Sequence, residues 1–356
     1  MAGDGESAHD GAGGAGERDR AGVARAIEAA ATSRLCTAPR PWVGALVVPA
    51  GAALDEGFAG ATDGQQGPHA EVVALSAAGE RARGATLYCT LEPCSHHGVT
   101  PPCADAVVAA GVARVVLGVL DPDTRVAGRG VARLRAAGIE VVTGVGAPAV
   151  ERQLAPYLHH RRTGRPLVVL KLAASLDGGT AAPDRTSQWI TSPEARADAH
   201  LLRAESDAIV VGAGTVRDDD PALTVRELPA SAAGLARKGQ PLRVVLGRAA
   251  SDRRVHPCIE HRGPLDGLLD ELGERGVLQC LVEGGATVAA AFHRAGLVDR
   301  YVFYLAPALF GGDDALGLFR GPGAATMSEL WRGRIDSVRR LGPDLRVDVV
   351  AATGEG

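Results

Sequence analysis

The sequence lacks three features that would define whole classes of protein. No run of about eighteen or more apolar residues occurs, so no segment is expected to cross a membrane as a helix. No strong excess of one charge occurs either: the net charge is −4 and the pI about 6.2, which argues against a general binder of nucleic acids or membrane surfaces. Residues 1–17 have neither a basic start nor an apolar stretch, so they predict a disordered tail rather than a signal peptide.

Lysine is almost absent from the chain. The chain has two lysines and 36 arginines, so Lys171 and Lys238 are more informative than a lysine usually is. Apolar residues make up 46% and charged residues 22% of the sequence, a composition that excludes global disorder. A length of 356 residues predicts two domains, each large enough to bury a core.

Short apolar runs alternate with segments of helical periodicity. In the first half, strands are predicted at 43–48, 85–91, 113–119 and 139–145, and helices at 21–33, 70–78, 103–110, 130–137 and 148–162. Thr163-Gly164-Arg165-Pro166 then marks a domain boundary. In the second half, strands are predicted at 167–172, 208–211, 243–246, 280–282 and 300–305, and helices at 193–204, 264–272 and 287–295. The alternation predicts two α/β domains, at 18–163 and 164–356, with helices on both faces of each sheet.

Three residues of the first half have the chemistry of a zinc site. His69 precedes one predicted helix, and Cys94 and Cys103 lie at the start of another, where the helix dipole favours thiolates. Three such ligands leave a fourth zinc position for water. Glu71 is placed to carry protons from that water to a leaving ammonia, as in the H-x-E…P-C-x-x-C pattern of zinc deaminases.

The spacing of the two cysteines departs from that pattern, because eight residues separate Cys94 from Cys103. Two alternatives therefore stay open. One is a buried free thiol beside a loop histidine, and the other is a closed structural zinc site with His96 or His97 as the fourth ligand. Glu71 favours the catalytic site, since a structural zinc site has no use for an acid.

The wider cysteine loop resembles one family. The segments TLEPCSHHG at 90–98, TPPC at 100–103, HAEV at 69–72 and DP at 121–122 are similar to the bifunctional RibD family of riboflavin biosynthesis, and the resemblance covers about residues 19–352. It implies a cytidine-deaminase-like three-layer domain with zinc, followed by a dihydrofolate-reductase-like α/β domain that uses NADPH. The implied reactions are hydrolytic deamination of 2,5-diamino-6-ribosylamino-4(3H)-pyrimidinone 5′-phosphate and reduction of its ribosyl group to a ribityl chain.

In the second half the residues alone say less, because the nearest match to G-x-G-x-x-G, at 212–217, has Arg217 in place of the third glycine. Gly284-Gly285, between a predicted strand and a predicted helix, suits a dinucleotide phosphate at the helix N-terminus, and the resemblance implies cofactor binding by Ala173, Trp189, Thr215 and Asp219. It implies substrate binding by Ser187, Arg203, Leu223, Arg226 and Glu283, and proton donation or polarisation at the opening ribose by Lys171. Trp189 as a core residue and Arg203 as a solvated helix residue remain alternatives.

Three positions of the deaminase half depart from the family. Arg40 and Asp123 stand where asparagine is common, and Val99 where lysine or arginine is common. Our hypothesis is that Arg40 anchors the phosphate or the ribose of the substrate, because arginine binds phosphate bidentately. Asp123 either pairs with Arg40 or repels phosphate. In the reductase half, the segment 254–268 is shorter than in the family, which predicts a loss at the edge of the sheet.

Three functions are compatible with these observations. The first is the bifunctional enzyme, and the second is a paralogue that acts on a related heterocycle or has one idle half. The third is a non-catalytic binding protein, against which Glu71 argues. We expect a phosphorylated pyrimidine as substrate, no nucleic-acid or membrane partner, a cytoplasmic location and a homo-oligomer.

Overall fold

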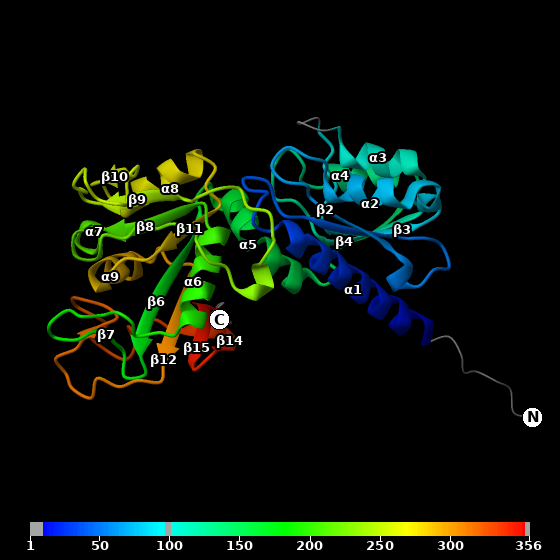
Figure 1. The fold of residues 1–356 in the computed structure, drawn as a ribbon. Helices are drawn as coiled ribbons and strands as arrows, with labels where there is room; N and C mark the ends of the chain where they lie inside the picture. The colour runs from blue at the N-terminus through cyan, green and yellow to red at the C-terminus, as the bar shows by residue number, and fades with distance from the viewer. Residues whose placement is uncertain (1–9, 97–100, 353–356) are drawn as a thin grey trace, which may run out of the picture. The chain divides into compact units, whose positions relative to one another are not determined.

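The structure is a computed structural model that describes residues 10–96 and 101–352, and the chain forms two compact units (Figure 1). The first unit comprises residues 1–162 together with Leu235–Lys238, and the second comprises 163–234 and 239–356. The division falls within one residue of the boundary predicted at Thr163-Gly164, but the short segment Leu235–Lys238 groups with the first unit. Among the described helices, none is both long enough and apolar enough to cross a membrane.

The first unit contains a five-stranded mixed sheet. Its order is β2 (Phe58–Ala61), β1 (Gly44–Val48), β3 (Thr86–Leu91), β4 (Arg114–Val119) and β5 (Glu140–Val142). The strands β3, β4 and β5 are parallel, whereas β1 runs antiparallel to both of its neighbours. The sequence did not predict β2, because its residues Phe-Ala-Gly-Ala have little apolar bulk.

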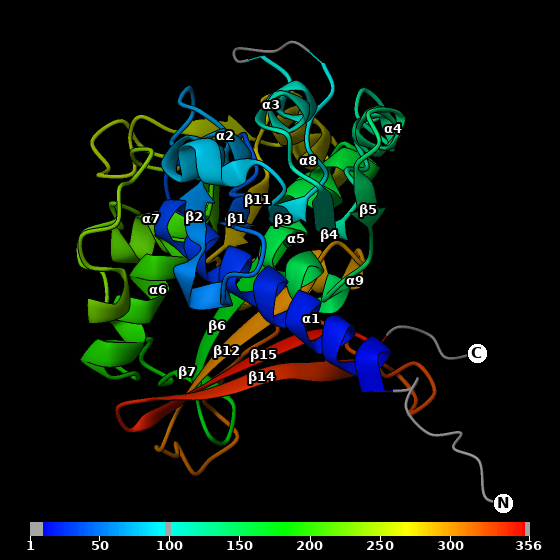
Figure 2. The same ribbon diagram turned by 90° about the vertical axis from the view of Figure 1, so that its right-hand side faces the viewer.

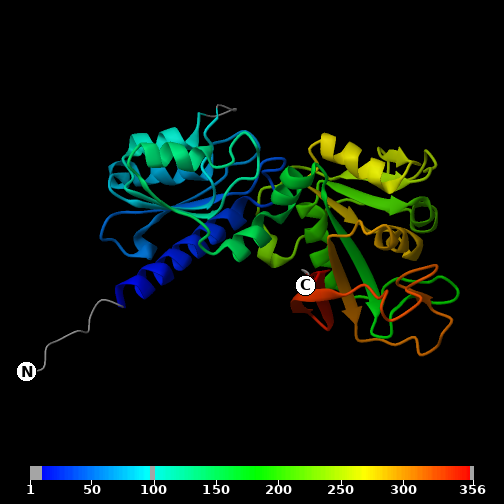
Figure 3. The same cartoon turned by 180° about the vertical axis from the view of Figure 1, so that it is seen from behind.

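Helices cover both faces of this sheet (Figures 1 and 3). One face carries α2 (Ala70–Ala78), α3 (Cys103–Ala110) and α4 (Arg129–Ala136), and the other carries α1 (Asp10–Ala30) and α5 (Ala147–Thr163). Two glycines allow the close approach: a Cβ at Gly44 would lie 1.8 Å from the carbonyl oxygen of Ala26 in α1, and one at Gly60 would lie 2.3 Å from that of Ala70 in α2. The three-layer arrangement predicted from the sequence is confirmed.

The predicted disordered tail is wrong for residues 10–17, because α1 begins at Asp10. Asp19 anchors this helix: it is 5% exposed and accepts two hydrogen bonds, of 2.7 and 2.8 Å, from the Arg114 guanidinium. Once one turn of a helix is fixed, each further residue gains a backbone hydrogen bond without a new nucleus, so the helix propagates beyond its apolar segment. Residues 1–9 lie outside the described part of the chain.

The second unit contains an eight-stranded sheet whose central strands are parallel. Its order is β10 (Ile259–His261), β9 (Leu242–Leu246), β8 (Ala208–Gly212), β11 (Gln279–Val282), β6 (Leu167–Ser175), β12 (Arg300–Ala306), β15 (Asp344–Ala351) and β14 (Gly333–Leu341). Figure 2 shows β6, β12, β15 and β14 side by side. A small separate sheet pairs β7 (Gly179–Ala181) with β13 (Leu316–Gly317). The short segment 254–268 still contributes a strand, because β10 pairs in parallel with β9 at the edge of the sheet.

Alternate residues of the central strands supply two separate cores. On one face, Val168 and Leu170 pack with α8 (Leu265–Glu274) and α9 (Ala286–Arg294). On the other face, Val169 packs with α6 (Pro193–Glu205) and α7 (Ala213–Asp219). This period of two, buried on both sides, is the expected consequence of parallel strands between helix layers.

Candidate functional sites

The predicted zinc ligands converge in the first unit. His69 is the extended residue before α2, Cys103 is the first residue of α3, and Cys94 lies in the loop after β3. The Nδ1 atom of His69 lies 3.1 Å from Sγ of Cys103 and 3.6 Å from Sγ of Cys94. All three donor atoms lie within 4.8 Å of one another, so a single ion can contact them all.

The protonation of the two sulfurs also fits a metal site. Hydrogen bonds from the Cys103 and His69 side chains outweigh burial and lower the pKa of Cys94 to about 4, and the backbone N–H of Cys103 donates to its Sγ at 3.3 Å. The hydrogen bond with Cys94, together with burial, raises the pKa of Cys103, so Cys103 keeps its proton more readily than Cys94. A divalent cation displaces such a proton, because cysteine binds metal as the thiolate. One imidazole and two thiolates are a donor set that zinc prefers.

Glu71 lies beside the ligands. Its side chain is buried, with 3% exposed, and its carboxyl group is hydrogen-bonded to the Cys103 side chain. Burial raises the pKa of Glu71, and the opposing charge of His69 does not cancel this effect. A carboxyl group whose pKa is moved towards neutrality is suited to accepting and returning a proton.

The closed structural zinc site gains no support from the described residues. His96 does not belong to the cluster of donor atoms, and its buried Nδ1 has no hydrogen-bond partner in the described part of the chain. His97 and Val99 lie outside the described residues. The convergence of Cys94, Cys103 and His69 favours a metal site over a buried free thiol beside a loop histidine.

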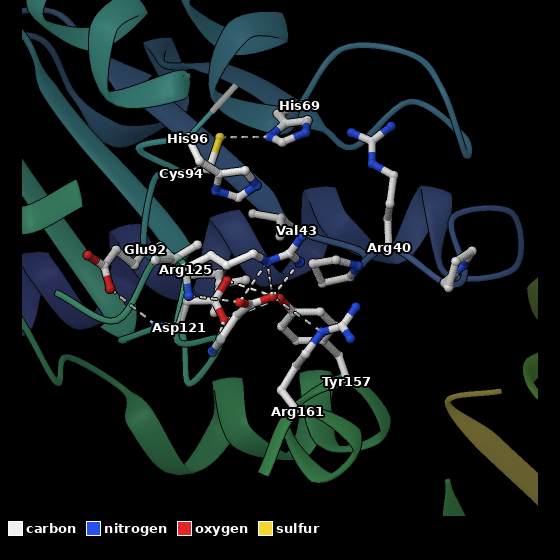
Figure 4. A pocket seen from close by; sticks show the side chains of 15 residues that line it. Arg40, Val43, His69, Glu92, Cys94, His96, Asp121, Arg125, Tyr157 and Arg161 are labelled. Carbon is white, nitrogen blue, oxygen red and sulfur yellow. Dashed lines mark hydrogen bonds and ion pairs between the residues drawn. The ribbon is translucent and has the colours of Figure 1, made fainter. Parts of the chain in front are cut away.

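A cavity of about 310 Å³ opens beside this cluster (Figure 4). Its walls come from the segment before β1, the ends of β3 and β4, and α5. The lining residues are Pro39, Arg40, Pro41, Val43, His69, Leu91, Glu92, Cys94, His96, Asp121, Asp123, Arg125, Val126, Tyr157 and Arg161.

Arg40 lies at the end of this cavity that is nearest to the predicted zinc ligand His69 (Figure 4). Its Nη1 atom donates to the carbonyl oxygen of Gly67, two residues before His69, at 2.9 Å. Its Nη2 atom is buried and has no hydrogen-bond partner among the described residues. Burial lowers the pKa of Arg40, while the nearby Cys103, Cys94 and Glu71 oppose this effect. Arginine remains charged under these conditions, so Arg40 offers an unpaired donor to the cavity.

Asp123 does not pair with Arg40, contrary to one of the two alternatives drawn from the sequence. Arg125 binds its carboxylate through two contacts, of 3.0 and 2.6 Å, and Nε of Arg161 lies 3.7 Å away. The hydrogen bonds from Arg125 lower the pKa of Asp123 to about 2, so this carboxylate is charged at any working pH.

Sequence reasoning missed Arg125, Tyr157 and Arg161 as cavity residues. The hydroxyl group of Tyr157 donates to both carboxylate oxygens of Asp121, at 3.2 and 3.0 Å. The one available signal was the spacing of Tyr157 and Arg161, which puts them one turn apart on α5. Nothing local in the sequence connects that helix with the loop after β4.

A cavity of about 390 Å³ in the second unit brings together all twelve residues that the resemblance assigned to the reductase. They come from β6, the segment before α6, α6 itself, α7 and the loop after it, and the end of β11. The twelve are Lys171, Ala173, Ser187, Trp189, Arg203, Thr215, Asp219, Leu223, Arg226, Glu283, Gly284 and Gly285. Ligands of open α/β sheets bind at the carboxyl ends of the strands, where this cavity lies.

Arg203 and Glu283 form a buried ion pair inside this cavity, and Lys171 lines the same cavity. Arg203 binds Glu283 through two hydrogen bonds of 2.7 Å, and their side chains are 17% and 8% exposed. Arg203 is therefore not a solvated helix residue. Burial lowers the pKa of Lys171, an effect that Glu283 opposes and Arg203 strengthens. The Nζ atom of Lys171 also lies 5.6 Å from the centre of the Tyr304 ring, within the range of a cation–π contact.

Gly284 and Gly285 lie directly before α9, at the N-terminus of this helix. A Cβ at Gly284 would lie 2.5 Å from Cβ of Val288, so a side chain does not fit there. A Cβ at Gly285 would lie 3.8 Å from Oγ1 of Thr215, which puts Thr215 of α7 beside this helix start. Backbone N–H groups at a helix N-terminus bind phosphate, so these residues fit the phosphates of a dinucleotide.

Trp189 is 68% exposed, so its interpretation as a core residue is wrong. Its ring lines the reductase cavity, and the guanidinium carbon of Arg196 lies 4.5 Å from the ring centre. Arg196 lines the same cavity, and sequence reasoning did not find it.

Comparison with known proteins identifies the family. Residues 17–119 match the cytidine and deoxycytidylate deaminase zinc-binding region, and residues 166–347 match the RibD C-terminal domain. The riboflavin biosynthesis protein RibD of Escherichia coli is 43% identical, over 93% of this chain and 98% of its own length. The chain belongs to the RibD family. The RibD protein of Mycobacterium tuberculosis is also 43% identical, over 92% of this chain and 95% of its own.

Solved RibD structures share the whole fold. Form 1 of RibD from Acinetobacter baumannii has a TM-score of 0.87 and 36% identity, and it covers 95% of this chain and 100% of its own. The Thermotoga maritima diaminohydroxyphosphoribosylaminopyrimidine deaminase/5-amino-6-(5-phosphoribosylamino)uracil reductase has a TM-score of 0.84 and 31% identity over the same shares. This chain is thus a bifunctional riboflavin-biosynthesis enzyme, with a zinc-dependent deaminase half and an NADPH-dependent reductase half. A divergent paralogue and a binding protein are not favoured.

Proposed function

We propose that the first unit deaminates 2,5-diamino-6-ribosylamino-4(3H)-pyrimidinone 5′-phosphate at C2 and yields 5-amino-6-(5-phosphoribosylamino)uracil. The convergence of His69, Cys94 and Cys103 beside buried Glu71 carries this proposal. Zinc bound by these three groups would act as a Lewis acid and so activate a water molecule. Glu71 would accept a proton from a water molecule at this site while the water oxygen bonds to C2. It returns the proton to the departing nitrogen as the C2–N bond breaks, so that ammonia leaves.

The second unit, in our proposal, reduces the ribosyl group of that product. NADPH bound in this cavity would supply the hydride that reduces C1′. Lys171 donates a proton to the ring oxygen as the C1′–O4′ bond opens, and its lowered pKa makes this donation easier. Trp189, Thr215, Asp219 and the Gly284-Gly285 pair hold the cofactor with Ala173, and their common cavity supports this assignment.

Substrate recognition is assigned to both cavities. Ser187, Leu223, Arg226 and the Arg203–Glu283 pair bind the phosphoribosyl substrate in the reductase. Arg40 contacts the substrate in the deaminase, where its free Nη2 atom supports the role.

Omission of single components tests both reactions. The full-length enzyme is incubated with the pyrimidine phosphate, zinc and NADPH, and products are read by mass spectrometry. Without NADPH we expect the deaminated uracil to accumulate, and after chelation of zinc we expect unreacted substrate. Reduction without deamination, or neither reaction in the complete mixture, would contradict the proposal.

We further propose that the enzyme works in the cytoplasm as a homo-oligomer. Large apolar side chains on the second unit support association, because Leu309 is 72% exposed, Met327 73% and Ile335 60%. Light scattering on the purified enzyme tests this proposal, and a monomeric mass at micromolar concentration would contradict it.

A further inference from the structure

One wall of the deaminase cavity is built after the end of the zinc-binding region. That region matches residues 17–119, whereas Asp121, Asp123, Arg125, Tyr157 and Arg161 line the cavity beyond it. Zinc deaminases share the residues that activate water, so contacts with the rest of the substrate must come from elsewhere. This wall is therefore where a substrate-specific contact is expected.

Arg161 stands out on this wall because its guanidinium is held in place without being fully paired. Its guanidinium carbon lies 5.1 Å from the centre of the Tyr157 ring, one turn back along α5. Its buried Nε atom lies 3.7 Å from the Asp123 carboxylate, which Arg125 already binds, and has no hydrogen-bond partner among the described residues. A buried donor without an acceptor is costly, so the site has the form of one that a ligand oxygen completes.

The carboxylates near Arg161 are bound more closely by other donors than by Arg161 itself. Two arginines, Arg125 and Arg161, face the single carboxylate of Asp123. The other two carboxylates of the cavity are occupied. Asp121 accepts the Tyr157 hydroxyl and the backbone N–H of Asp123, and Glu92 accepts the backbone N–H groups of residues 121, 128 and 131. A guanidinium fork matches the oxygens of a phosphate group in both geometry and charge.

The chemistry of the proposed substrate places its phosphate away from the metal. The amino group that leaves is on C2, whereas the ribosyl phosphate is attached through the nitrogen on C6. Arg40 lies at the zinc end, bonded to Gly67 and close to the charges of Cys103 and Glu71. Figure 4 shows Arg161 on a different side of the cavity, on the helix below.

We propose that Arg161, supported by Arg125, receives the 5′-phosphate, and that Arg40 contacts the pyrimidine or the ribose. This inference rests on the proposed deaminase function and narrows the role of Arg40. Asp123 keeps the two guanidinium groups of Arg125 and Arg161 on one wall, and the Nε atom of Arg161 remains available to a phosphate oxygen. Recognition of the phosphate thus comes from α5 and from the loop after β4.

The variant R161Q tests the assignment in the full-length zinc enzyme. Ammonia release is measured without NADPH, on the phosphorylated substrate and on its dephosphorylated counterpart. We expect KM for the phosphorylated substrate to rise about ten- to a hundredfold at unchanged kcat, and KM for the other form to stay the same. R162Q is the matched control, because Arg162 is the next residue of α5, is 54% exposed and pairs with Glu151 at 3.6 Å.

Two further measurements keep the outcome decisive even if R161Q folds poorly. R161K keeps the charge without the fork, and it should recover part of the lost affinity. In the wild-type enzyme, inorganic phosphate should inhibit deamination of the dephosphorylated substrate competitively. Equal KM increases for both substrates, loss of phosphate discrimination in R40Q instead of R161Q, or no inhibition by phosphate would each overturn the assignment. A wild-type enzyme that releases no ammonia from either substrate would instead contradict the proposed function.

Discussion

Replacing Glu283 with glutamine tests how strongly its carboxylate stabilises the positive charges of the reductase cavity. The variant E283Q removes the ion-pair partner of Arg203, whose side chain is only 17% exposed, and it removes the negative charge that favours protonated Lys171. Breaking a buried ion pair by removing one partner costs about 3–5 kcal/mol of unfolding free energy. Lys171 can lose its proton, since its pKa is already lowered, and the amide oxygen still accepts one hydrogen bond. We therefore expect a loss near the lower limit, about 3 kcal/mol at pH 7.

Urea denaturation of the full-length enzyme measures this loss through tryptophan fluorescence, because Trp189 and Trp331 both lie in the second unit. E274Q is the matched control, as Glu274 is an exposed residue of α8. The double variant R203M/E283Q should recover most of the lost stability, because it removes the uncompensated charge, but it should not recover reduction. A loss below about 1 kcal/mol in E283Q would refute a strong pairing in this cavity.

The pH dependence of the same variant has a defined sign. Burial raises the pKa of Glu283, but Arg203 and Lys171 outweigh it, so the net pKa lies below 4.5. The stabilisation is therefore complete above pH 4.5 and is lost as the pH falls through the lower pKa of the folded state. The difference in the free energy of unfolding between wild type and E283Q should become smaller in that acidic range.

Two other predictions concern the reacting groups. C94S should lose both zinc and ammonia release. E71Q should retain about one zinc per chain and lose deamination, because glutamine removes the proton carrier and no ligand. Metal analysis beside an ammonia assay checks both variants, and an active E71Q would exclude Glu71 as the proton carrier. For the reductase, the alkaline limb of the pH–rate profile should lie below pH 10.5, because Lys171 acts as the protonated amine and burial lowers its pKa from that value. A limb at or above pH 10.5, or an active K171M, would assign the proton to another group.

The elements that were predicted well are those with a local signal. The helices α2 and α3 have the predicted bounds, since small apolar residues fill them and a glycine follows each. The strands β14 and β15 were not predicted, because arginines and aspartates interrupt their apolar residues. Part of this charge is compensated only in three dimensions, because Arg346 of β15 also binds Asp198 of α6, 148 residues away in the sequence. A pattern read along the chain contains no trace of such a pairing.

The same distinction applies to the sites. His69, Glu71, Cys94 and Cys103 could be predicted because the chemistry of a zinc site requires these residue types in this order. Arg161 could not, since its contact with Asp123 joins positions 38 residues apart in the sequence. Tyr157 and Arg161 form part of what looks, in sequence, like a polar helix at a domain boundary.

The near-absence of lysine gives the reductase cavity a chemical handle. Lys171 lines that cavity, and Lys238 is the only other lysine side chain in the chain. A lowered pKa leaves more of the Lys171 amine unprotonated and hence nucleophilic near neutral pH. Reductive methylation should therefore label the cavity through a single residue, with Lys238 as an internal reference. A bound dinucleotide should protect Lys171 from methylation. The mass of the peptide that contains Lys171 would then report whether the cavity is occupied, independently of turnover.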